Sequence, residues 1–223
     1  KSMIATRTEV APTIDGNLDD EAWDQAIALD DFIQFEPYNL KPTSVETEVR
    51  VLYDDKYLYI AFQNFDPDPT KIMSRMSRRD DFEGIERNAD WVGIGIDSNN
   101  DDRTGYHFFV NPAGSRMDVA LTGPGMGGFD PSWNAVWDFK SALNEDGWSI
   151  EYRFPFSIFP FEANSDQDWG FFAARHIQYK QEETQWPCVP FGVEGFVPYY
   201  GVLKGISDVP PPKKLEVVPY LLS

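Results

Sequence analysis

The feature that most constrains this chain is a two-residue alternation of apolar side chains that returns in many short segments. It is clearest in Asp90–Gly114, where Val92, Ile94 and Ile96 alternate with residues of the opposite face. This period places one set of side chains on a single face of a β-strand. An acidic loop, 97–105, and a second aromatic and β-branched run follow, so the segment predicts a β-hairpin.

Similar segments recur along the chain, with turn signals between them. Thr47–Tyr53 and Tyr57–Phe65 flank an Asp-Asp-Lys turn and form a second hairpin by pattern. A short helix is expected from Asp19 to Ala26. Short strands at regular spacing predict an all-β sandwich or barrel. The other expected strands are Ser2–Val10, Phe32–Phe35, Lys71–Arg79, Arg116–Leu121, Trp133–Lys140, Trp148–Phe154, Trp169–Tyr179 and Tyr199–Leu203.

Charge and length narrow the class of protein. The 223 residues include 19 basic and 37 acidic side chains, a net charge of −18. Nucleic acids and anionic membranes both need a cationic surface, so we expect neither as a partner. No apolar run reaches the roughly 18 residues of a membrane-spanning helix, so we expect no membrane insertion by this stretch. A chain of this length needs no disulfide to build a core, and Cys188 is its single cysteine.

We expect residues 1–207 to form one module and residues 208–223 to leave it. Asp208–Lys214 is a Pro-rich linker, and Leu215–Ser223 begins another alternating strand with no partner in this chain. This strand is expected to start a following domain. The amino terminus has no apolar signal-peptide segment.

Four segments together resemble one known family. They are I-D-G-N-L-D-D-E-A-W at Ile14–Trp23, V-R-V-L-Y-D-D-K-Y-L-Y-I at Val49–Ile60, the Asp90–Gly114 hairpin, and D-G-W-S-I-E-Y-R-F-P-F at Asp146–Phe156. The chain resembles the family 9 carbohydrate-binding modules. The resemblance implies an antiparallel β-sandwich with a jelly-roll or immunoglobulin-like two-sheet architecture.

Further motifs make the chain similar to the module at the amino terminus of a group of bacterial outer-membrane barrel proteins. They are R-R-D at Arg78–Asp80, N-P-A-G, S-W-N-A-V-W at Ser132–Trp137 and a terminal L-x-V-x-P-Y. This resemblance implies a bacterial cell-envelope location, in the periplasm or at the outer membrane. It also implies a C-terminal barrel domain of the same protein as a partner.

The resemblance also points to positions that contact sugar. In sugar-binding members of the family, two tryptophans sandwich the sugar, and Glu, Arg and Gln side chains assist. The Glu falls here at Gly93, the Arg near Phe109 and the Gln near Ala174. The first tryptophan falls near Arg87, and Trp186 is the candidate for the second.

We predict ligand contact for Trp91, Trp186, Arg87 and Arg175. Flat aromatic faces suit the C–H surface of a sugar. Trp91 is out of phase with the core-facing residues of its strand, and Trp186 falls in a predicted Pro-rich loop. Trp133 and Trp137 stay open cases. Three other tryptophans occupy core-facing positions, and we predict a core role for Trp23, Trp148 and Trp169.

The acidic loop is the candidate metal site. Four oxygen-bearing side chains lie within six residues: Asp97, Asn99, Asp101 and Asp102. Such spacing suits Ca²⁺, which takes six to eight oxygen ligands, and the resemblance implies a structural calcium ion. The alternative is a turn whose side chains bind their own backbone. No organic cofactor is predicted.

The sequence carries no recognisable catalytic constellation. His107 and His176 are the only histidines, and no zinc, phosphate-loop or serine-hydrolase motif occurs. The prediction is therefore a non-catalytic module that binds carbohydrate or another small ligand. One alternative is a structural or gating domain of an outer-membrane barrel. Others are haem binding through Met117 or Met126, and a domain associated with a glycoside hydrolase.

Overall fold

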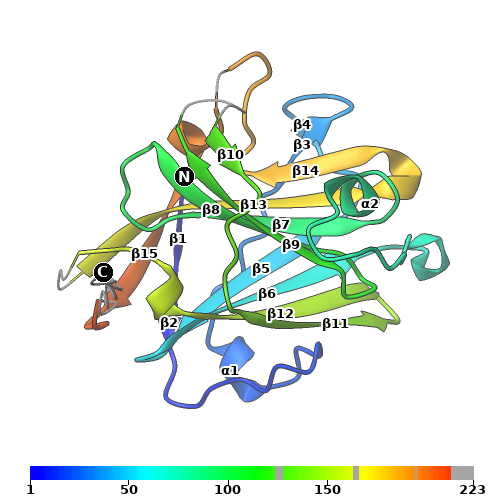
Figure 1. Ribbon diagram of the computed structural model, residues 1–223. Coiled ribbons are helices and arrows are strands. Elements are labelled where there is room, and N and C mark those ends of the chain that lie inside the picture. Colours follow the sequence, from blue (N-terminus) through cyan, green and yellow to red (C-terminus); the bar gives the residue numbers. More distant parts are fainter. Residues whose placement is uncertain (124–127, 163–165, 194, 212–223) are drawn as a thin grey trace, which may run out of the picture.

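Two antiparallel-rich sheets are stacked face to face in the computed structural model, which describes residues 1–123, 128–162, 166–193 and 195–211 (Figure 1). In the described residues, the larger sheet comprises β1 (Ser2–Ile4), β3 (Ile33–Glu36), β4 (Lys41–Pro42), β7 (Trp91–Asp97), β8 (Thr104–Val110), β9 (Arg116–Thr122), β10 (Phe129–Asp130), β13 (Asp166–Ile177), β14 (Glu182–Trp186) and β15 (Gly201–Ser207). The predicted sandwich is confirmed.

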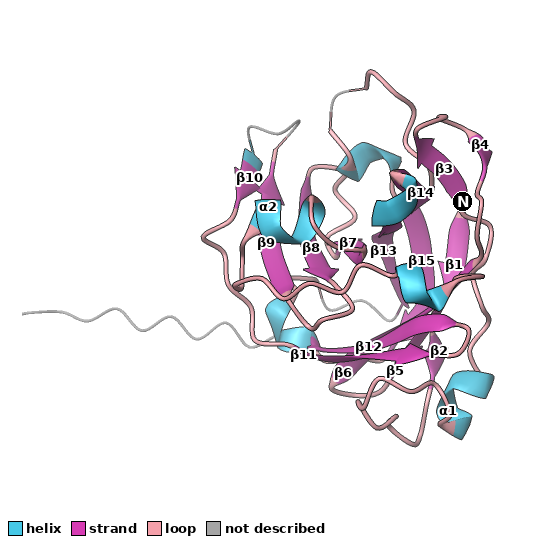
Figure 2. Ribbon diagram, turned by 90° about the vertical axis from the view of Figure 1, so that its right-hand side faces the viewer, coloured by secondary structure: helices cyan, strands magenta, loops and turns pink. Residues whose placement is uncertain are grey.

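The smaller sheet lies below the larger one in Figure 2 and has α1 (Glu21–Asp24) beneath it. Its strand order is β11-β12-β6-β5-β2. The strands are β2 (Thr6–Arg7), β5 (Thr47–Tyr53), β6 (Tyr57–Phe65), β11 (Asp138–Asn144) and β12 (Gly147–Pro155). No helix in the described ranges has the length and apolar character to cross a membrane.

Strand β13 organises the larger sheet because it pairs with three strands. It pairs along β7 and β14 through its C-terminal half, and with β15 through its N-terminal half. From β10 to β4 the order is β10-β9-β8-β7-β13-β14-β3-β4. The outer face of this sheet therefore brings together residues that lie far apart in the sequence.

The main core fills the space between the sheets. Trp148 and Trp169 are fully buried there, and Trp23 of α1 is 2% exposed in a smaller cluster between α1 and the smaller sheet, so all three predicted core tryptophans are confirmed. Trp137 is also buried in the main core. Burial of such large side chains is the main stabilising contribution to a sandwich.

The segment before α1 is attached to the smaller sheet by one buried carboxylate. Glu151 accepts hydrogen bonds from the backbone N–H groups of Asp15 and Gly16, at 2.9 and 2.8 Å, and from Trp23 Nε1 at 2.8 Å. Within the described ranges, Glu151 forms no ion pair with a basic side chain.

Several expected boundaries differ from the structure. Residues 72–79 contain no strand, so the strand expected at Lys71–Arg79 is wrong. The strand expected at Trp133–Lys140 corresponds to β11, which begins later, at Asp138, and continues to Asn144. A short helix that was not expected, α2 (Phe82–Glu86), begins after Asp81, whose carboxylate accepts a hydrogen bond from the Gly84 N–H at 3.0 Å. The predicted strand Leu215–Ser223 lies outside the described residues.

Candidate aromatic cavity on the larger sheet

The outer face of the larger sheet is built from rows of cross-strand partners. One row crosses four neighbouring strands, β7, β13, β14 and β3, through Trp91, His176, Glu183 and Glu36. Register partners project to the same face of a sheet. An aromatic ring, an imidazole and two carboxylates therefore stand side by side on this face.

The next row has small residues at its centre. It crosses five strands, from β9 through β8, β7 and β13 to β14, by way of Met117, Phe109, Gly93, Ala174 and Gln185. A Cβ atom at Gly93 would lie 2.8 Å from the Phe109 ring. Glycine at this position therefore lets the ring lie against the sheet.

A third row repeats this arrangement. His107, Gly95 and Phe172 are register partners on β8, β7 and β13. A Cβ atom at Gly95 would lie 2.7 Å from the ring of Tyr200 and 2.9 Å from His107 Nε2. The alternate glycines of β7 therefore hollow the outer face of the sheet, while the intervening isoleucines face the core.

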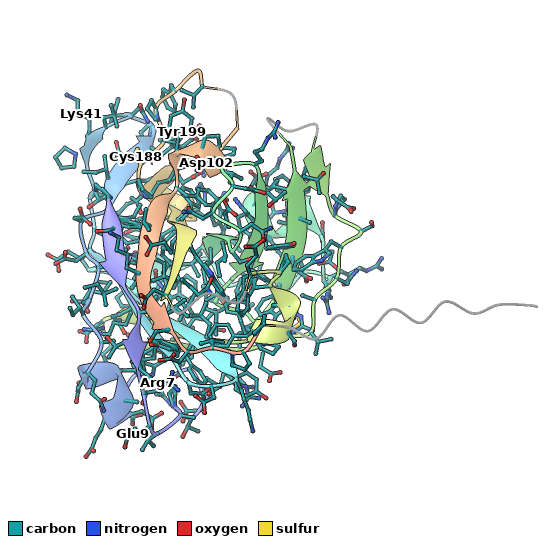
Figure 3. The ribbon with its side chains drawn as sticks, turned by 90° about the vertical axis from the view of Figure 1, so that its left-hand side faces the viewer. Arg7, Glu9, Lys41, Asp102, Cys188 and Tyr199 are labelled. Carbon is teal, nitrogen blue, oxygen red and sulfur yellow. The ribbon has the colours of Figure 1, made fainter. Side chains whose placement is uncertain are left out.

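A cavity of about 520 Å³ occupies this hollow. Helix α2 and residues 195–198 complete its walls, and most of its lining is apolar and aromatic. Asp102, on one edge, lies at the same end of the molecule as Tyr199 and Cys188, and far from Arg7 and Glu9 (Figure 3). The principal aromatic side chains are Phe35, Phe82, Trp91, Phe109, Phe129, Phe172 and Phe196.

Besides Asp102 at the edge, three carboxylates line the cavity from three elements: Glu36 from β3, Glu86 from α2 and Glu183 from β14. Burial, with the neighbouring charges of Glu36 and Glu86, raises the pKa of Glu183 from 4.5 to about 7, against a hydrogen bond from Gln185 that lowers it. Burial also raises the pKa of Glu86. In the described part of the chain, none of the three forms an ion pair with a basic side chain.

Both histidines at the cavity are held in surroundings that disfavour charge. Burial lowers the pKa of His107 to about 4, and its Nε2 atom interacts with the Tyr200 hydroxyl. Burial also lowers the pKa of His176, whose Nε2 lies 3.0 Å from Gln178 Oε1. His107 is therefore neutral at pH 7, and the surroundings of His176 favour its neutral form too.

A family model described as carbohydrate family 9 binding domain-like matches residues 14–183. This match covers most of the chain, from the segment before α1 into β14. The chain belongs to the carbohydrate family 9 binding domain-like family. No curated protein sequence matches it significantly.

Solved structures show the same fold. A family 9 module from Caldicellulosiruptor kristjanssonii in complex with glucose has a TM-score of 0.65 at 18% identity, with 95% of this chain and 100% of that chain covered. A family 9 module from the same organism in complex with cellotriose gives a TM-score of 0.62 at 18% identity, with 100% of both chains covered. A protein from Bacteroides uniformis ATCC 8492 gives a TM-score of 0.67 at 14% identity, with 92% and 98% covered.

The structure places the positions expected to carry the family's Glu, Arg and Gln in one row. Gly93, Phe109 and Ala174 are register partners on β7, β8 and β13. All three positions are apolar in this family 9 domain, although Gln185 ends the row on β14. Two carboxylates of the cavity, Glu36 and Glu183, lie in the neighbouring row, and Glu86 lies on α2.

Of the four predicted ligand-contact residues, Trp91 lines the cavity. Its ring stacks on His176 at 5.5 Å and 11°, and meets the Phe109 ring edge-on at 5.4 Å. It is only 5% exposed, and its Nε1–H has no hydrogen-bond partner among the described residues. Its ligand contact stays a prediction, which this location supports.

Trp186 lies elsewhere, and its predicted loop position is wrong. It is the last residue of β14, 1% exposed, and packs in the main core beside Phe171 and against Gly201. The alternation along β14 explains this position. Gln185 lines the cavity, so the next side chain projects to the inner face.

Arg175 and Arg87 do not line the cavity either. Arg175 is fully buried between the sheets, where its Nη1 donates to the Glu46 carbonyl at 2.9 Å and to Thr47 Oγ1 at 3.1 Å. Burial lowers its pKa to about 10, against the opposing charges of Asp90 and Asp66. Arg87 ends α2 on the surface, 3.8 Å from Glu83. A direct ligand role for Arg175 is inconsistent with this burial.

The four predicted metal ligands share one loop, whose carboxylates bind its own backbone. Asp97 accepts hydrogen bonds from the N–H groups of Asn99, Asp101 and Asp102, at 2.9 to 3.1 Å. Asp101 accepts from the N–H groups of Arg103 and Thr104. In the described ranges, no group of three or more His, Cys, Asp or Glu side chains is arranged to hold a metal ion. The calcium ion stays a prediction.

No pattern in the sequence indicated that Glu36, Glu86 and Glu183 lie together. Glu36 and Glu183 meet only through the β14–β3 pairing, which joins segments far apart in the sequence, and Glu86 comes from the short helix α2. The alternate glycines in V-G-I-G-I were a usable signal. A strand with small residues on one face and isoleucines on the other indicates a hollow on the small face.

Proposed function

We propose that this chain is a non-catalytic carbohydrate-binding module and that the cavity on the larger sheet is its binding site. The observation that carries the proposal is the aromatic cavity of about 520 Å³, built on one face of a family 9 sandwich. The Caldicellulosiruptor modules of the same fold were solved with glucose and with cellotriose. A preformed concave site with few polar groups is typical of small-ligand recognition.

The lining suits a sugar because it combines aromatic surface with hydrogen-bonding groups. Aromatic rings bury the C–H faces of a pyranose, while carboxylates and amides bond its hydroxyl groups. Trp91 supplies the aromatic surface and a free Nε1–H, and Glu183 and Gln185 supply polar groups. Since Gly93, Phe109 and Ala174 are apolar, we propose that recognition uses Gln185 at the end of their row and the neighbouring row that contains Trp91 and Glu183.

Calorimetric titration with a panel of neutral and amine-bearing oligosaccharides tests the proposal. We expect saturable binding to the native protein, and a loss of at least about tenfold in affinity for Trp91→Ala, about 1.4 kcal/mol. Trp133→Ala is the matched control, since Trp133 packs on Tyr106 and Phe108 away from the cavity. Absence of binding across the whole panel would refute the proposal, and so would equal losses in the two variants.

One observation supports the alternative of haem binding: Met117, a candidate haem ligand, lines the cavity. Met126 lies outside the described residues. An absorption spectrum of the protein mixed with haemin tests this alternative. A Soret shift that Met117→Leu abolishes would favour haem over carbohydrate.

The cellular context is a separate proposal. We propose a bacterial cell-envelope location, with a C-terminal barrel domain as the partner of this module, on the resemblance of its motifs. Fractionation of the source cells followed by immunodetection tests it. Recovery of the protein with the cytoplasmic fraction would refute it.

A further inference from the structure

We propose that the cavity selects saccharides that carry a protonated amine, with the ammonium group held between Glu36, Glu86 and Glu183. The ligand class is an oligosaccharide of 2-amino-2-deoxyhexose units. This inference rests on the proposed function and deepens it, because it names the chemistry that distinguishes the ligand from neutral sugars.

The first support is the grouping of the carboxylates. Glu36 and Glu183 are register partners on neighbouring strands, and Glu86 approaches them from α2 closely enough that the charge of Glu36 raises its pKa. Three like charges at one wall of an apolar cavity repel one another. In the described part of the chain no Lys or Arg side chain pairs with them, so a cation from the ligand would relieve the repulsion.

The other ionisable side chains around the cavity form no ion pair with Glu36, Glu86 or Glu183 among the described residues. The neighbouring imidazole of His176 has a lowered pKa, so its surroundings favour the neutral form. Arg103 lines the cavity beside Asp102, in the loop between β7 and β8. Arg87 is exposed on α2 and reaches Glu83, and its charge lowers the pKa of Glu86 against the effect of burial. In the described part of the chain, Arg87 thus offsets part of the charge at Glu86, but no basic side chain forms an ion pair with any of the three carboxylates.

The aromatic wall is the second, independent support. Trp91 stands in the same row as Glu183 and Glu36, with His176, which stacks on the indole, between them. A saccharide of several units can therefore contact the aromatic part of the cavity while its ammonium group meets the carboxylates. The Trp91 Nε1–H, buried without a partner among the described residues, is a free donor for a sugar oxygen.

The departures from the family pattern favour the same ligand. At the row where the resemblance expects Glu, Arg and Gln, this chain has Gly93, Phe109 and Ala174, which cannot bond neutral hydroxyl groups through their side chains. Binding of a neutral sugar against three carboxylates would also desolvate charge without compensation. An amino sugar answers both features, since its ring meets the aromatic floor and its ammonium meets the carboxylates.

Calorimetry with three matched trimers tests the inference: the fully deacetylated glucosamine trimer, the N-acetylglucosamine trimer and cellotriose. At low salt and a pH that keeps the amine protonated, we expect the glucosamine trimer to bind at least tenfold more tightly than the other two. Glu183→Gln should reduce this preference at least threefold. Glu83→Gln, on the exposed side of α2, is the control and should leave it unchanged.

The outcomes separate this inference from the proposed function. Equal affinity for the three trimers, or a preference that Glu183→Gln leaves intact, would overturn the amine selectivity while carbohydrate binding stands. Binding by none of the trimers would overturn both. Thermal melting of each variant shows whether it is folded, and Glu86→Gln provides a second test of the same wall if Glu183→Gln does not fold.

Discussion

At the scale of single residues, Glu183 couples the cavity to pH. Its folded pKa of about 7 lies above the ordinary 4.5, so the folded state holds its proton more tightly than the unfolded state. The stability that this group contributes is present below pH 4.5 and is lost as the pH rises to 7. Above pH 7 the contribution no longer changes.

The native protein should lose stability as the pH rises from 4.5 to 7.5, because Glu183 loses its proton, and Glu183→Gln should not show this loss. We therefore expect the free energy of unfolding of the variant, relative to that of the native protein, to be about 1–3 kcal/mol higher at pH 7.5 than at pH 4.5. Denaturant titrations at several pH values measure this difference. His107 contributes with the opposite sign, since its lowered pKa makes stability rise with pH, so only the difference between the two proteins isolates Glu183. Parallel profiles would contradict the prediction.

Arg175 shows how far the sequence alone could place single side chains. Its strand alternates, and Arg175 is in phase with Trp169, which the sequence correctly assigns to the core. The phase therefore indicated a buried arginine, although its charge favoured a surface position. The sequence did not indicate the hydrogen-bond acceptors of Arg175, because the Glu46 carbonyl and the Thr47 hydroxyl lie at the other sheet.

At the scale of elements, the two alternate glycines of β7, Gly93 and Gly95, face different side chains, so replacing each by alanine should have a different effect. An added methyl group at Gly93 meets the Phe109 ring, a side chain that can turn away into the cavity. We expect Gly93→Ala to weaken ligand binding with a stability change below about 1.5 kcal/mol. Calorimetric titration and thermal melting measure the two effects.

Gly95→Ala is the informative comparison. Its methyl group meets both the Tyr200 ring and His107, which are packed against each other. We expect a loss of about 2–4 kcal/mol in stability from this overpacking, with a matching fall in melting temperature. Equal melting temperatures for the two alanine variants would mean that the hollow is not formed by these contacts.

The acidic loop after β7 allows a test of both its own hydrogen bonds and the predicted calcium ion. Because the Asp97 carboxylate accepts three backbone hydrogen bonds, we expect Asp97→Ala to destabilise the protein by about 2–4 kcal/mol. Melting curves of the native protein with and without a chelator test the predicted calcium ion, and an unchanged melting temperature would mean that these hydrogen bonds alone close the turn. A fall with chelator that Ca²⁺ restores would instead establish the calcium ion predicted from the sequence.

At the scale of the whole molecule, the sequence indicates the layers but not how they bring a site together. Hairpins and core tryptophans follow from local alternation, so the sandwich was predictable. The cavity depends on β13, which pairs with β7 from a distant part of the chain as well as with the following strands β14 and β15. The bulge between Glu183 and Thr184 also shifts the register of β14 against β3. Long-range register of this kind leaves little signal in one sequence.

The net charge of −18 gives the last prediction, in which salt acts oppositely on folding and on ligand binding. Self-repulsion of so acidic a chain opposes its compact state, and screening by salt reduces this repulsion, so added NaCl should raise the melting temperature.

The same screening by salt weakens the attraction between the carboxylate wall and an ammonium group. Between 0.05 and 0.5 M NaCl we expect affinity for the glucosamine trimer to fall several-fold while affinity for cellotriose barely changes, roughly as the Debye length shortens. Melting curves and titrations in the same buffers measure both effects. If salt leaves the binding of the amine-bearing trimer unaffected while the melting temperature rises, the ammonium group does not meet Glu36, Glu86 and Glu183.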